Sequence, residues 1–402
     1  MNDLFGLIRS PRHILFGSGQ RHAAGRLAAS LGKRVLVCTD ERFSASPEMT
    51  GLLKNLEDNG VDVRVYDRTE PDLPVGNGYD CVARHKAFQP DAVIGAGGGS
   101  CLDMAKLASL LLAHDGEASR YYGENQVPGP TVPVIAMPTT SGTGSEATPV
   151  AVLADDSRDL KIGISSAHLI PHAAICDPEL TLTCPPGLTA VAGADAMTHA
   201  IEAFTAIRRT PDAGLSQDRV FVGKNLFSDR YALLALEALA HYLPKAVQDG
   251  SDLQARSQVM YGALMAGLAF GTAGTAAAHA IQYPVGALTH TAHGAGVATL
   301  MPYVMDFNID TCQSEYAAIA RAMGAEGTDE AALAREAPGM VARLFAGIGI
   351  PATLAQLGVE QDHLAPIVEQ SLLAKRLVDN NPRALDAAAI RSIVTHAFNG
   401  RM

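Results

Sequence analysis

The chain has 402 residues, more than one hydrophobic core usually serves, so two domains are expected. Hydrophobic residues make up 48% and charged residues 18%, a balance that argues against a disordered protein. The net charge of −11, without a basic block, argues against a nucleic-acid partner, and six scattered cysteines without a CxxC pair indicate reduced thiols in a cytoplasmic protein.

The first half of the chain alternates short β-branched runs with helical patterns. Strands are expected at 33–40, 61–67, 91–99 and 132–140, and helices at 23–31, 49–59, 79–88 and 102–112. Such alternation predicts a parallel sheet with helices on both faces. Residues 151–177 indicate further strand pairs around a turn at Asp155–Arg158.

The pattern changes after the sequence CPPG (184–187) to Ala- and Leu-rich helices. We therefore expect an α/β domain over residues 1–185 and an all-helical domain over residues 186–402. The segment 208–229 is polar and broken by Pro and Gly, which predicts a long loop that could close over a bound molecule. The apolar segment 259–284 is long enough for a membrane span, but its Gly, Ala, His, Tyr and Pro content favours a buried helix.

A glycine-rich turn follows the third expected strand. The sequence DAVIGAGGGSCLDMAK (91–106) runs from a strand through glycines into a helix, where free N–H groups and the helix dipole favour a phosphate group. A tight turn without a ligand is the alternative, because Ser100 stands where a GxGxxG motif has its last glycine. A second small, hydroxyl-rich loop, PTTSGTGSE (138–146), follows the next strand.

A carboxylate ends an earlier strand, at Asp40. It is placed either to accept hydrogen bonds from ribose hydroxyls or to cap the next helix. Its charge would repel a 2′-phosphate, so NAD is favoured over NADP.

The sequence GADAMTHAIEAF (193–204) places Asp195 and His199 one helical turn apart on one face. This spacing suits two metal ligands and is also common by chance. A charge-free run from 257 to 305 carries further histidines. We expect a helix to end near His279, because proline and glycine follow, and a second helix to begin at His293.

A helix end and a helix start can bring His279 and His293 to one point. One carboxylate oxygen and three imidazole nitrogens, without sulfur, suit Fe(II), Zn(II) or Mn(II). Hydrogen-bonded core histidines are the alternative. His290 lies in a loop pattern and is expected not to be a ligand.

At these residues the sequence resembles the iron-containing (group III) alcohol dehydrogenase family. The resemblance rests on PRHILFGSG, GGGSCLDMAK, PTTSGTGSE, GADAMTHAIEAF, HGAGVATLMPYVMDFN and NNPRAL, which occur in family order over nearly the whole chain. It implies an α/β N-terminal dinucleotide-binding domain with a parallel, Rossmann-like sheet and an all-α C-terminal domain, a dehydroquinate synthase-like architecture with the active site between the domains. It also implies a homodimer or larger assembly.

The resemblance assigns residues to the site. The implied metal ligands are Asp195, His199, His279 and His293, with Fe(II) as the ion and Zn(II) as the alternative. The implied cofactor contacts are Asp40, Gly97, Gly98, Gly99, Ser100, Asp103, Thr139, Thr140, Thr143 and Lys161. Phe270 matches a residue that lines the substrate pocket in relatives.

Tyr283 departs from the family pattern, because many members have a histidine four residues after the third ligand. A phenol has a pKa of about 10, so Tyr283 is not an obvious general base, and a role in shaping the pocket is at least as well founded. Together with the loop sequence GKNLFSD, the Tyr-Pro pair resembles the hydroxyacid–oxoacid transhydrogenase branch, which handles 4-hydroxybutyrate and related acids.

The expected function is that of a metal- and NAD(P)-dependent alcohol dehydrogenase or aldehyde reductase. Hydride would pass between nicotinamide C4 and a metal-bound primary alcohol or aldehyde. Lys224 or Arg208, on the expected loop, would meet a carboxylate if the substrate carries one. The alternatives are a 4-hydroxybutyrate-type dehydrogenase, a cofactor-retaining transhydrogenase, a metal-free relative such as a maleylacetate reductase, and a sensor without catalysis. No nucleic-acid or membrane partner is expected.

Overall fold

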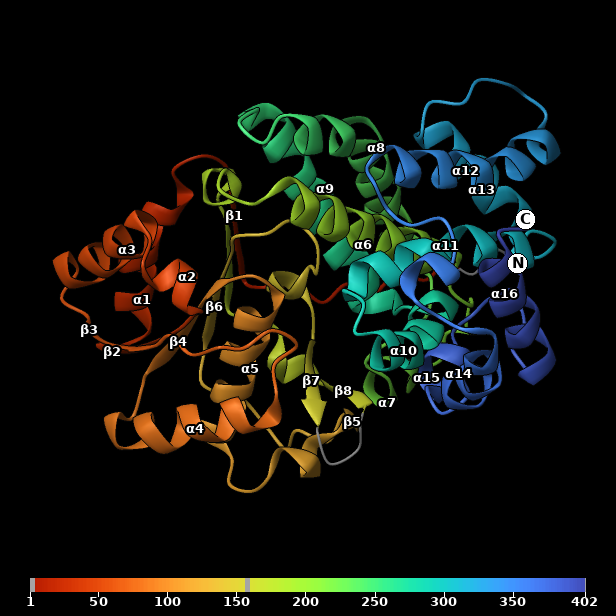
Figure 1. Cartoon of the computed structure of the whole chain (residues 1–402). Helices are drawn as coiled ribbons and strands as arrows, with labels where there is room; N and C mark the ends of the chain where they lie inside the picture. The colour runs from red at the N-terminus through yellow and green to blue at the C-terminus, as the bar shows by residue number, and fades with distance from the viewer. Residues whose placement is uncertain (1–3, 156–159, 402) are drawn as a thin grey trace.

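A six-stranded parallel sheet forms the first part of the molecule in the computed structural model, which describes residues 4–155 and 160–401 (Figure 1). In spatial order its strands are β1 (His13–Phe16), β9 (Ala173–Cys176), β6 (Val134–Pro138), β4 (Ala92–Gly97), β2 (Arg34–Cys38) and β3 (Asp62–Tyr66). The paired strands of this sheet run parallel. The expected parallel sheet is therefore confirmed.

Helices cover both faces of this sheet. Helices α1 (Ala24–Leu31) and α3 (Pro47–Asp58) pack against one face, where Val35 and Val37 point. Helices α4 (Val75–His85) and α5 (Gly99–Ala113) pack against the other face, where Leu36 points. Successive side chains of β2 therefore point into two separate hydrophobic cores.

A smaller, three-stranded sheet lies beside the first. Its strands are β7 (Val150–Asp155) and β8 (Leu160–Ser165), which pair antiparallel, and β5 (Gly123–Glu124), which pairs parallel with β8. The strand pair expected within 151–177 is present. Beyond its first residue, the turn expected at Asp155–Arg158 lies outside the described residues.

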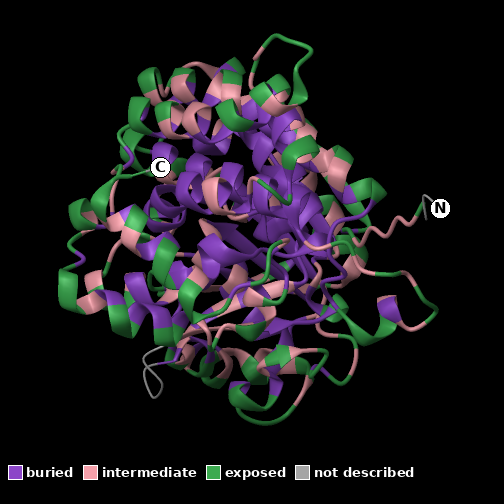
Figure 2. Ribbon diagram, turned by 90° about the vertical axis from the view of Figure 1, so that its right-hand side faces the viewer, coloured by how far each residue is buried: buried purple, intermediate pink, exposed green. Residues whose placement is uncertain are grey.

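From α6 (Pro186–Thr205) onward, the regular elements among the described residues are helices. They are α7 (Leu215–Asp218), α8 (Leu226–Gln248), α9 (Leu253–Ala273), α10 (Ala277–Thr289), α11 (His293–Asn308), α12 (Gln313–Ala322), α13 (Glu330–Gly347), α14 (Leu364–Ser371), α15 (Lys375–Val378) and α16 (Ala387–Asn399). Figure 2 shows the buried residues gathered along the inner helices of this part. The division at residue 185 stays a prediction.

The expected loop 208–229 is interrupted by α7 and ends four residues early, because α8 begins at Leu226. Asn225 starts α8 with a capping box, in which it accepts backbone N–H groups while Ser228 receives the N–H of Asn225. A cap of this kind stabilises the first helical turn and fixes where the loop stops.

The helix expected to end near His279 ends earlier, and this prediction is wrong. Gly274 takes a φ of 83° at the end of α9, and the chain re-enters a helix at α10. His279 therefore lies in the first turn of α10, while Pro284 lies inside that helix. Among the described residues no single helix is long and apolar enough to cross a membrane, and α9 with α10 passes such a test only as a pair bent by 102°.

Candidate metal and dinucleotide site

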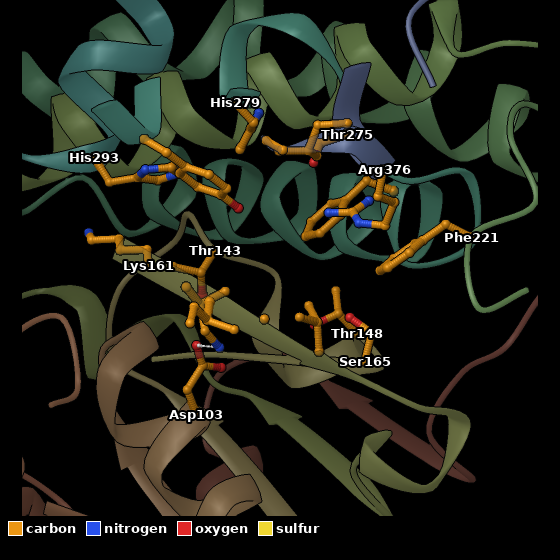
Figure 3. Close-up of a pocket in the computed structure, with 18 of the residues that line it drawn as sticks. Asp103, Thr143, Thr148, Lys161, Ser165, Phe221, Thr275, His279, His293 and Arg376 are labelled. Atoms are coloured by element: carbon orange, nitrogen blue, oxygen red, sulfur yellow. Dashed lines mark hydrogen bonds between the residues drawn. The ribbon is translucent and has the colours of Figure 1, made fainter. Parts of the chain in front are cut away.

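A cavity of about 660 Å³ lies between the sheets and the helices (Figure 3). One wall comes from the turn between β4 and α5 and from strands β7 and β8. The opposite wall comes from α6, α9, α10, α11 and α15. The carboxyl ends of parallel strands are where α/β proteins commonly bind ligands, and the turn after β4 is such an end.

The four expected metal ligands meet in the helical wall. Asp195 and His199 lie one turn apart on α6, His279 comes from α10, and His293 is the first residue of α11. Oδ1 of the aspartate lies 3.6, 3.8 and 3.9 Å from the Nε2 atoms of His199, His279 and His293, respectively. Helices that are distant in sequence therefore bring three nitrogens and one oxygen to one point.

The three distances from Asp195 fit ligands of a single divalent cation, and the ligand atoms of Asp195, His199 and His279 all lie within 4.8 Å of one another, a set that does not include His293. Nitrogen and oxygen ligands lie about 2.0–2.2 Å from such an ion, so two ligands of one ion are at most about 4.4 Å apart. Oδ1 of Asp195 and Nε2 of His279 are buried and have no hydrogen-bond partner among the described residues. Buried polar atoms are otherwise nearly always satisfied, so a cation at this point would resolve both exceptions.

Burial keeps two of these histidines in the form that a metal requires. It lowers the pKa of His199 to about 4 and the pKa of His293 to about 3. Both imidazoles are therefore neutral at pH 7, and each has one unprotonated nitrogen that can ligate a metal.

Glu202, which sequence analysis missed, supports the site from behind. Its Oε2 accepts a hydrogen bond from Nδ1 of His279 at 2.6 Å, which leaves Nε2 of that ring turned toward Asp195. The same carboxylate accepts the N–H groups of Ala276 and Ala278 at the start of α10. The sequence offered one signal for Glu202. It lies seven residues after Asp195 and three residues after His199, on the same helix.

Two aromatic residues line the cavity next to the histidines. Phe270, on α9, stacks on His199 with 4.1 Å between ring centroids. Tyr283, on α10, lies with its ring centroid 6.3 Å from that of His293. Burial raises the pKa of Tyr283, so its hydroxyl stays protonated at neutral pH.

The glycine turn brings backbone close to the cavity. A Cβ atom at Gly97 would lie 2.5 Å from Sγ of Cys101, so a larger residue does not fit there. Gly98 is the N-cap of α5, and Gly99 and Ser100, in its first turn, line the cavity. The turn thus presents a helix N-terminus to the cavity, as a phosphate site requires.

The second hydroxyl-rich loop packs against this turn. The N–H of Thr139 donates to the carbonyl of Gly97 at 2.8 Å, and Thr140 has side-chain atoms 3.7 Å from where a Cβ of Gly98 would lie. The side chain of Thr143 packs against Gly99, where an added Cβ would lie 2.5 Å from Cγ2 of Thr143, and Thr143 also lines the cavity. Gly99, Ser100, Asp103, Thr143 and Lys161 are the expected cofactor residues that the cavity wall contains.

Asp40 caps a helix, which was one of its two expected roles. Its Oδ1 accepts the N–H of Phe43 at 2.8 Å at the start of α2 (Glu41–Ser44). Its Oδ2 lies 3.5 Å from Sγ of Cys101, beside the glycine turn. One carboxylate oxygen is thus used by the cap, and the other stays beside the turn.

Asp103 and Lys161 hold the sheet side of the cavity. Asp103 accepts hydrogen bonds from Oγ of Ser145 at 2.6 Å and from the N–H of Val152 at 3.0 Å, which ties α5 to the hydroxyl-rich loop and to β7. Lys161, on β8, pairs with Asp72 at 2.6 Å.

The structure does not bring Lys224 to the cavity. Its Nζ lies 2.9 Å from a carboxylate oxygen of Glu315 and 3.2 Å from one of Asp229. Arg208 also pairs with Asp229, at 3.4 Å. Both cations are held by carboxylates of the helical part, so neither supplies the free charge that the sequence analysis expected to meet a substrate.

A different cation, Arg376 on α15, lies in the cavity wall and was missed. Its guanidinium carbon lies 4.3 Å from the ring centroid of Phe221. Its Nη1 is buried and has no hydrogen-bond partner among the described residues. The residue lies on a four-residue helix outside every recognised motif, so the sequence carried no signal for it.

Comparisons with known proteins confirm the resemblance. Family models match residues 11–178 ("Iron-containing alcohol dehydrogenase") and residues 189–398 ("Fe-containing alcohol dehydrogenase family, C-terminal"). Long-chain-alcohol dehydrogenase 1 of Geobacillus thermodenitrificans is 36% identical over 92% of this chain and 90% of its own length. NAD-dependent methanol dehydrogenase of Bacillus methanolicus is 33% identical over 96% and 98%, respectively. A crystal structure of 1,3-propanediol oxidoreductase matches with a TM-score of 0.90 and 31% identity, over 98% of this chain and 100% of that one. The chain therefore belongs to the iron-containing alcohol dehydrogenase family, and it is an NAD(P)-linked oxidoreductase of alcohols and aldehydes.

Proposed function

We propose that the protein transfers hydride reversibly between NAD and a primary alcohol or its aldehyde, within the cavity between the sheets and the helices. The balanced reaction is RCH2OH + NAD⁺ → RCHO + NADH + H⁺. The observation that carries this proposal is the set of three Nε2 atoms 3.6–3.9 Å from one oxygen of Asp195, in the wall of a cavity that also contains the glycine turn.

The proposed metal ligands are Asp195, His199, His279 and His293, with Fe(II) as the ion and Zn(II) as the alternative. A bound divalent cation supplies Lewis acidity, and bound NAD accepts or supplies the hydride. Nitrogen and oxygen donors suit both metals, and the family to which the chain belongs favours iron. The protein's own contribution is the orientation of the ligands.

We propose that the dinucleotide lies along the glycine turn. The first turn of α5, at Gly99 and Ser100, faces the cavity and offers backbone N–H groups to the pyrophosphate. Asp40 lies beside this turn, where its charge would repel a 2′-phosphate. NAD is therefore proposed over NADP.

Tyr283 and Phe270 are proposed to shape the substrate end of the cavity. Phe270 holds the ring of His199 by stacking, so it restricts that ligand while presenting an apolar surface. Tyr283 keeps its proton at neutral pH, so it serves as a hydrogen-bond donor or as a wall and not as a base. The proton released in alcohol oxidation therefore leaves by another group or by water.

A homodimer or larger assembly is also proposed. Strand β1 forms an edge of the six-stranded sheet, and its Ile14 and Phe16 are each 38% exposed. An edge strand with exposed apolar side chains can pair with a second copy of the chain. Sedimentation velocity tests this, and a monomer at micromolar concentration would contradict it.

The test of the proposed function is an anaerobic rate assay on metal-stripped protein. The protein is reloaded with Fe(II), with Zn(II) or with no metal, and is given NADH or NADPH with a panel of neutral and acidic aldehydes. We expect metal-dependent oxidation of NADH that exceeds oxidation of NADPH. Turnover that needs no free nucleotide, but only a hydroxyacid paired with an oxoacid, would instead favour a transhydrogenase.

A further inference from the structure

Arg376 lies in the wall of the reaction cavity and forms no ion pair with a described residue. Its Nη1 is buried and has no hydrogen-bond partner among the described residues. Helix α15, which carries it, packs against α10, the helix of His279 and Tyr283. The side chain is half-buried and lines the cavity, and its guanidinium donates no hydrogen bond to a described residue, so it is available to an acceptor within that cavity.

The other cations in the cavity wall already have carboxylate partners. Lys161 pairs with Asp72, and Lys375 pairs with Asp379, each at 2.6 Å. Arg376 belongs to none of the ion pairs found among the described residues. It is therefore the cation of this wall that is free to receive an anion from outside.

Glu124 is the acidic group of the protein that competes for this arginine. It lines the same cavity, but its Oε2 accepts the N–H groups of Val220 at 2.8 Å and of Phe221 at 3.3 Å. These bonds hold the carboxylate on the backbone of the segment that carries the stacking ring. Glu124 therefore forms no ion pair with Arg376 among the described residues, although its charge favours the protonated guanidinium.

The guanidinium has a defined orientation. Phe221 lies against it with 4.3 Å between the guanidinium carbon and the ring centroid, a cation–π contact that holds the guanidinium in place without accepting a hydrogen bond in its plane. Arginine binds carboxylates and related oxyanions through two parallel hydrogen bonds from such an edge.

The arginine stands apart from the expected centre of reaction. In Figure 3, Arg376 and Phe221 lie at one side of the cavity and His293 and Lys161 at the other, with His279 and Thr275 between them. A molecule that meets Arg376 with one end would therefore extend its other end toward the histidines.

We infer that Arg376 binds an anionic oxyacid group, a carboxylate or a sulfonate, at the far end of a short-chain alcohol or aldehyde. This inference rests on the proposed function and names the substrate class: ω-hydroxy acids and the corresponding aldehyde acids. Arg376 takes the role that the sequence analysis gave to the basic loop, and it determines specificity without taking part in hydride transfer.

The experiment compares acidic and neutral aldehydes of matched length. The values of kcat and KM are measured for 4-oxobutanoate against butanal and for sulfoacetaldehyde against propanal. The proteins are the wild type, Arg376→Met, Arg376→Lys and Arg383→Met. The last is a matched control, because its guanidinium also lies over a phenylalanine, at 4.2 Å from Phe307, but outside the cavity.

We expect Arg376→Met to lower kcat/KM for the preferred acid by about 10- to 100-fold, mainly through KM, because a hydrogen-bonded charge pair is lost. The neutral aldehyde should change by less than threefold. Arg376→Lys should restore part of the loss, and Arg383→Met should keep the ratio of acid to neutral substrate. The acid that is preferred distinguishes a carboxylate from a sulfonate.

Equal losses for acidic and neutral aldehydes, or no loss in Arg376→Met, would overturn the inference. Reduction of neutral aldehydes only, by the wild type, would overturn it while the proposed function stands. If no aldehyde is reduced, the proposed function fails. Calorimetric titration with butanoate then tests separately whether Arg376 binds a carboxylate. In that case binding to the wild type and not to Arg376→Met supports the site, and equal binding overturns it.

Discussion

The carboxylate of Glu202 joins the imidazole of His279 to the start of the helix that carries it. Oε2 accepts the Nδ1–H of His279 at 2.6 Å, and both oxygens together accept two backbone N–H groups of the first turn of α10. One acidic side chain thus fixes the tautomer of a proposed metal ligand and the position of its backbone.

Replacing Glu202 with glutamine should therefore weaken metal binding. Carboxylates that hold a metal-ligating histidine by a hydrogen bond typically contribute about 10- to 100-fold to metal affinity, so we expect a loss in that range for Fe(II) and Zn(II). Competition with a chelator of known affinity measures it. Glu237→Gln, on an exposed position of α8, is the control, and unchanged affinity in Glu202→Gln would contradict the proposed support.

The coenzyme preference depends on the charge at Asp40. Asp40→Asn keeps a side-chain oxygen that can cap α2 at Phe43, but it removes the negative charge. We expect the ratio of kcat/KM for NADPH to that for NADH to rise by at least about tenfold, as expected when a repulsion of about 1.4 kcal/mol is removed. Thermal unfolding of both proteins checks that the cap is intact. A ratio that stays constant in a stable variant would place the selectivity elsewhere.

Two substitutions of Tyr283 test whether its hydroxyl contributes to the pH dependence of kcat/KM. The raised pKa of Tyr283 predicts no ionisation from this residue between pH 6 and 9. Tyr283→Phe should keep the shape of the wild-type profile of kcat/KM, with a loss of less than about tenfold for one neutral hydrogen bond. Tyr283→His should add a limb at or below the ordinary imidazole pKa of about 6.5, because burial lowers the pKa of an imidazole in this wall, as it does at His293. A loss of 100-fold or more in Tyr283→Phe, on the scale of general acid catalysis, would show instead that the hydroxyl transfers a proton.

The free energy of unfolding should depend on the protonation of Glu146, the buried last residue of the hydroxyl-rich loop. Burial raises the pKa of Glu146 to about 7 from an ordinary value of 4.5. The folded state therefore keeps a proton that the unfolded state releases above pH 4.5. The contribution of this group is fully present below pH 4.5 and is lost as the pH rises to 7, by up to about 1.4 kcal/mol per pH unit.

Urea unfolding of metal-free wild type and Glu146→Gln from pH 4.5 to 8 measures this contribution. Groups common to both proteins cancel in the difference between their free energies of unfolding. We expect that difference to shift in favour of the glutamine variant from pH 4.5 to 7 and then to level off. A difference that is independent of pH would contradict the raised pKa.

Local sequence patterns were sufficient to predict the parallel sheet, the glycine turn and the start of a helix at His293. Strand–helix alternation and small residues at a strand end are encoded within about 20 residues, so the sequence displays them directly. The spacing of Asp195 and His199 is equally local, since both lie on α6.

Long-range contacts decided the features that the sequence did not reveal. The start of α10 is held by Glu202, 74 residues before the first N–H group that it accepts. Lys224 is held by Glu315, 91 residues later, which removes it from the cavity. Arg376 enters the cavity through the packing of α15 on α10, a placement that no pattern around residue 376 specifies.

The central claim is a direct transfer of hydride between nicotinamide and substrate carbon in this cavity. The most direct measurement supplies NADH carrying deuterium at the transferred position of C4, with Fe(II)-loaded protein and an aldehyde that the rate assay has identified. Mass spectrometry of the alcohol product should find one deuterium on C1 for each NADH oxidised, and none with metal-stripped protein. Alcohol formed without deuterium on C1, or NADH oxidised without alcohol, would contradict the account.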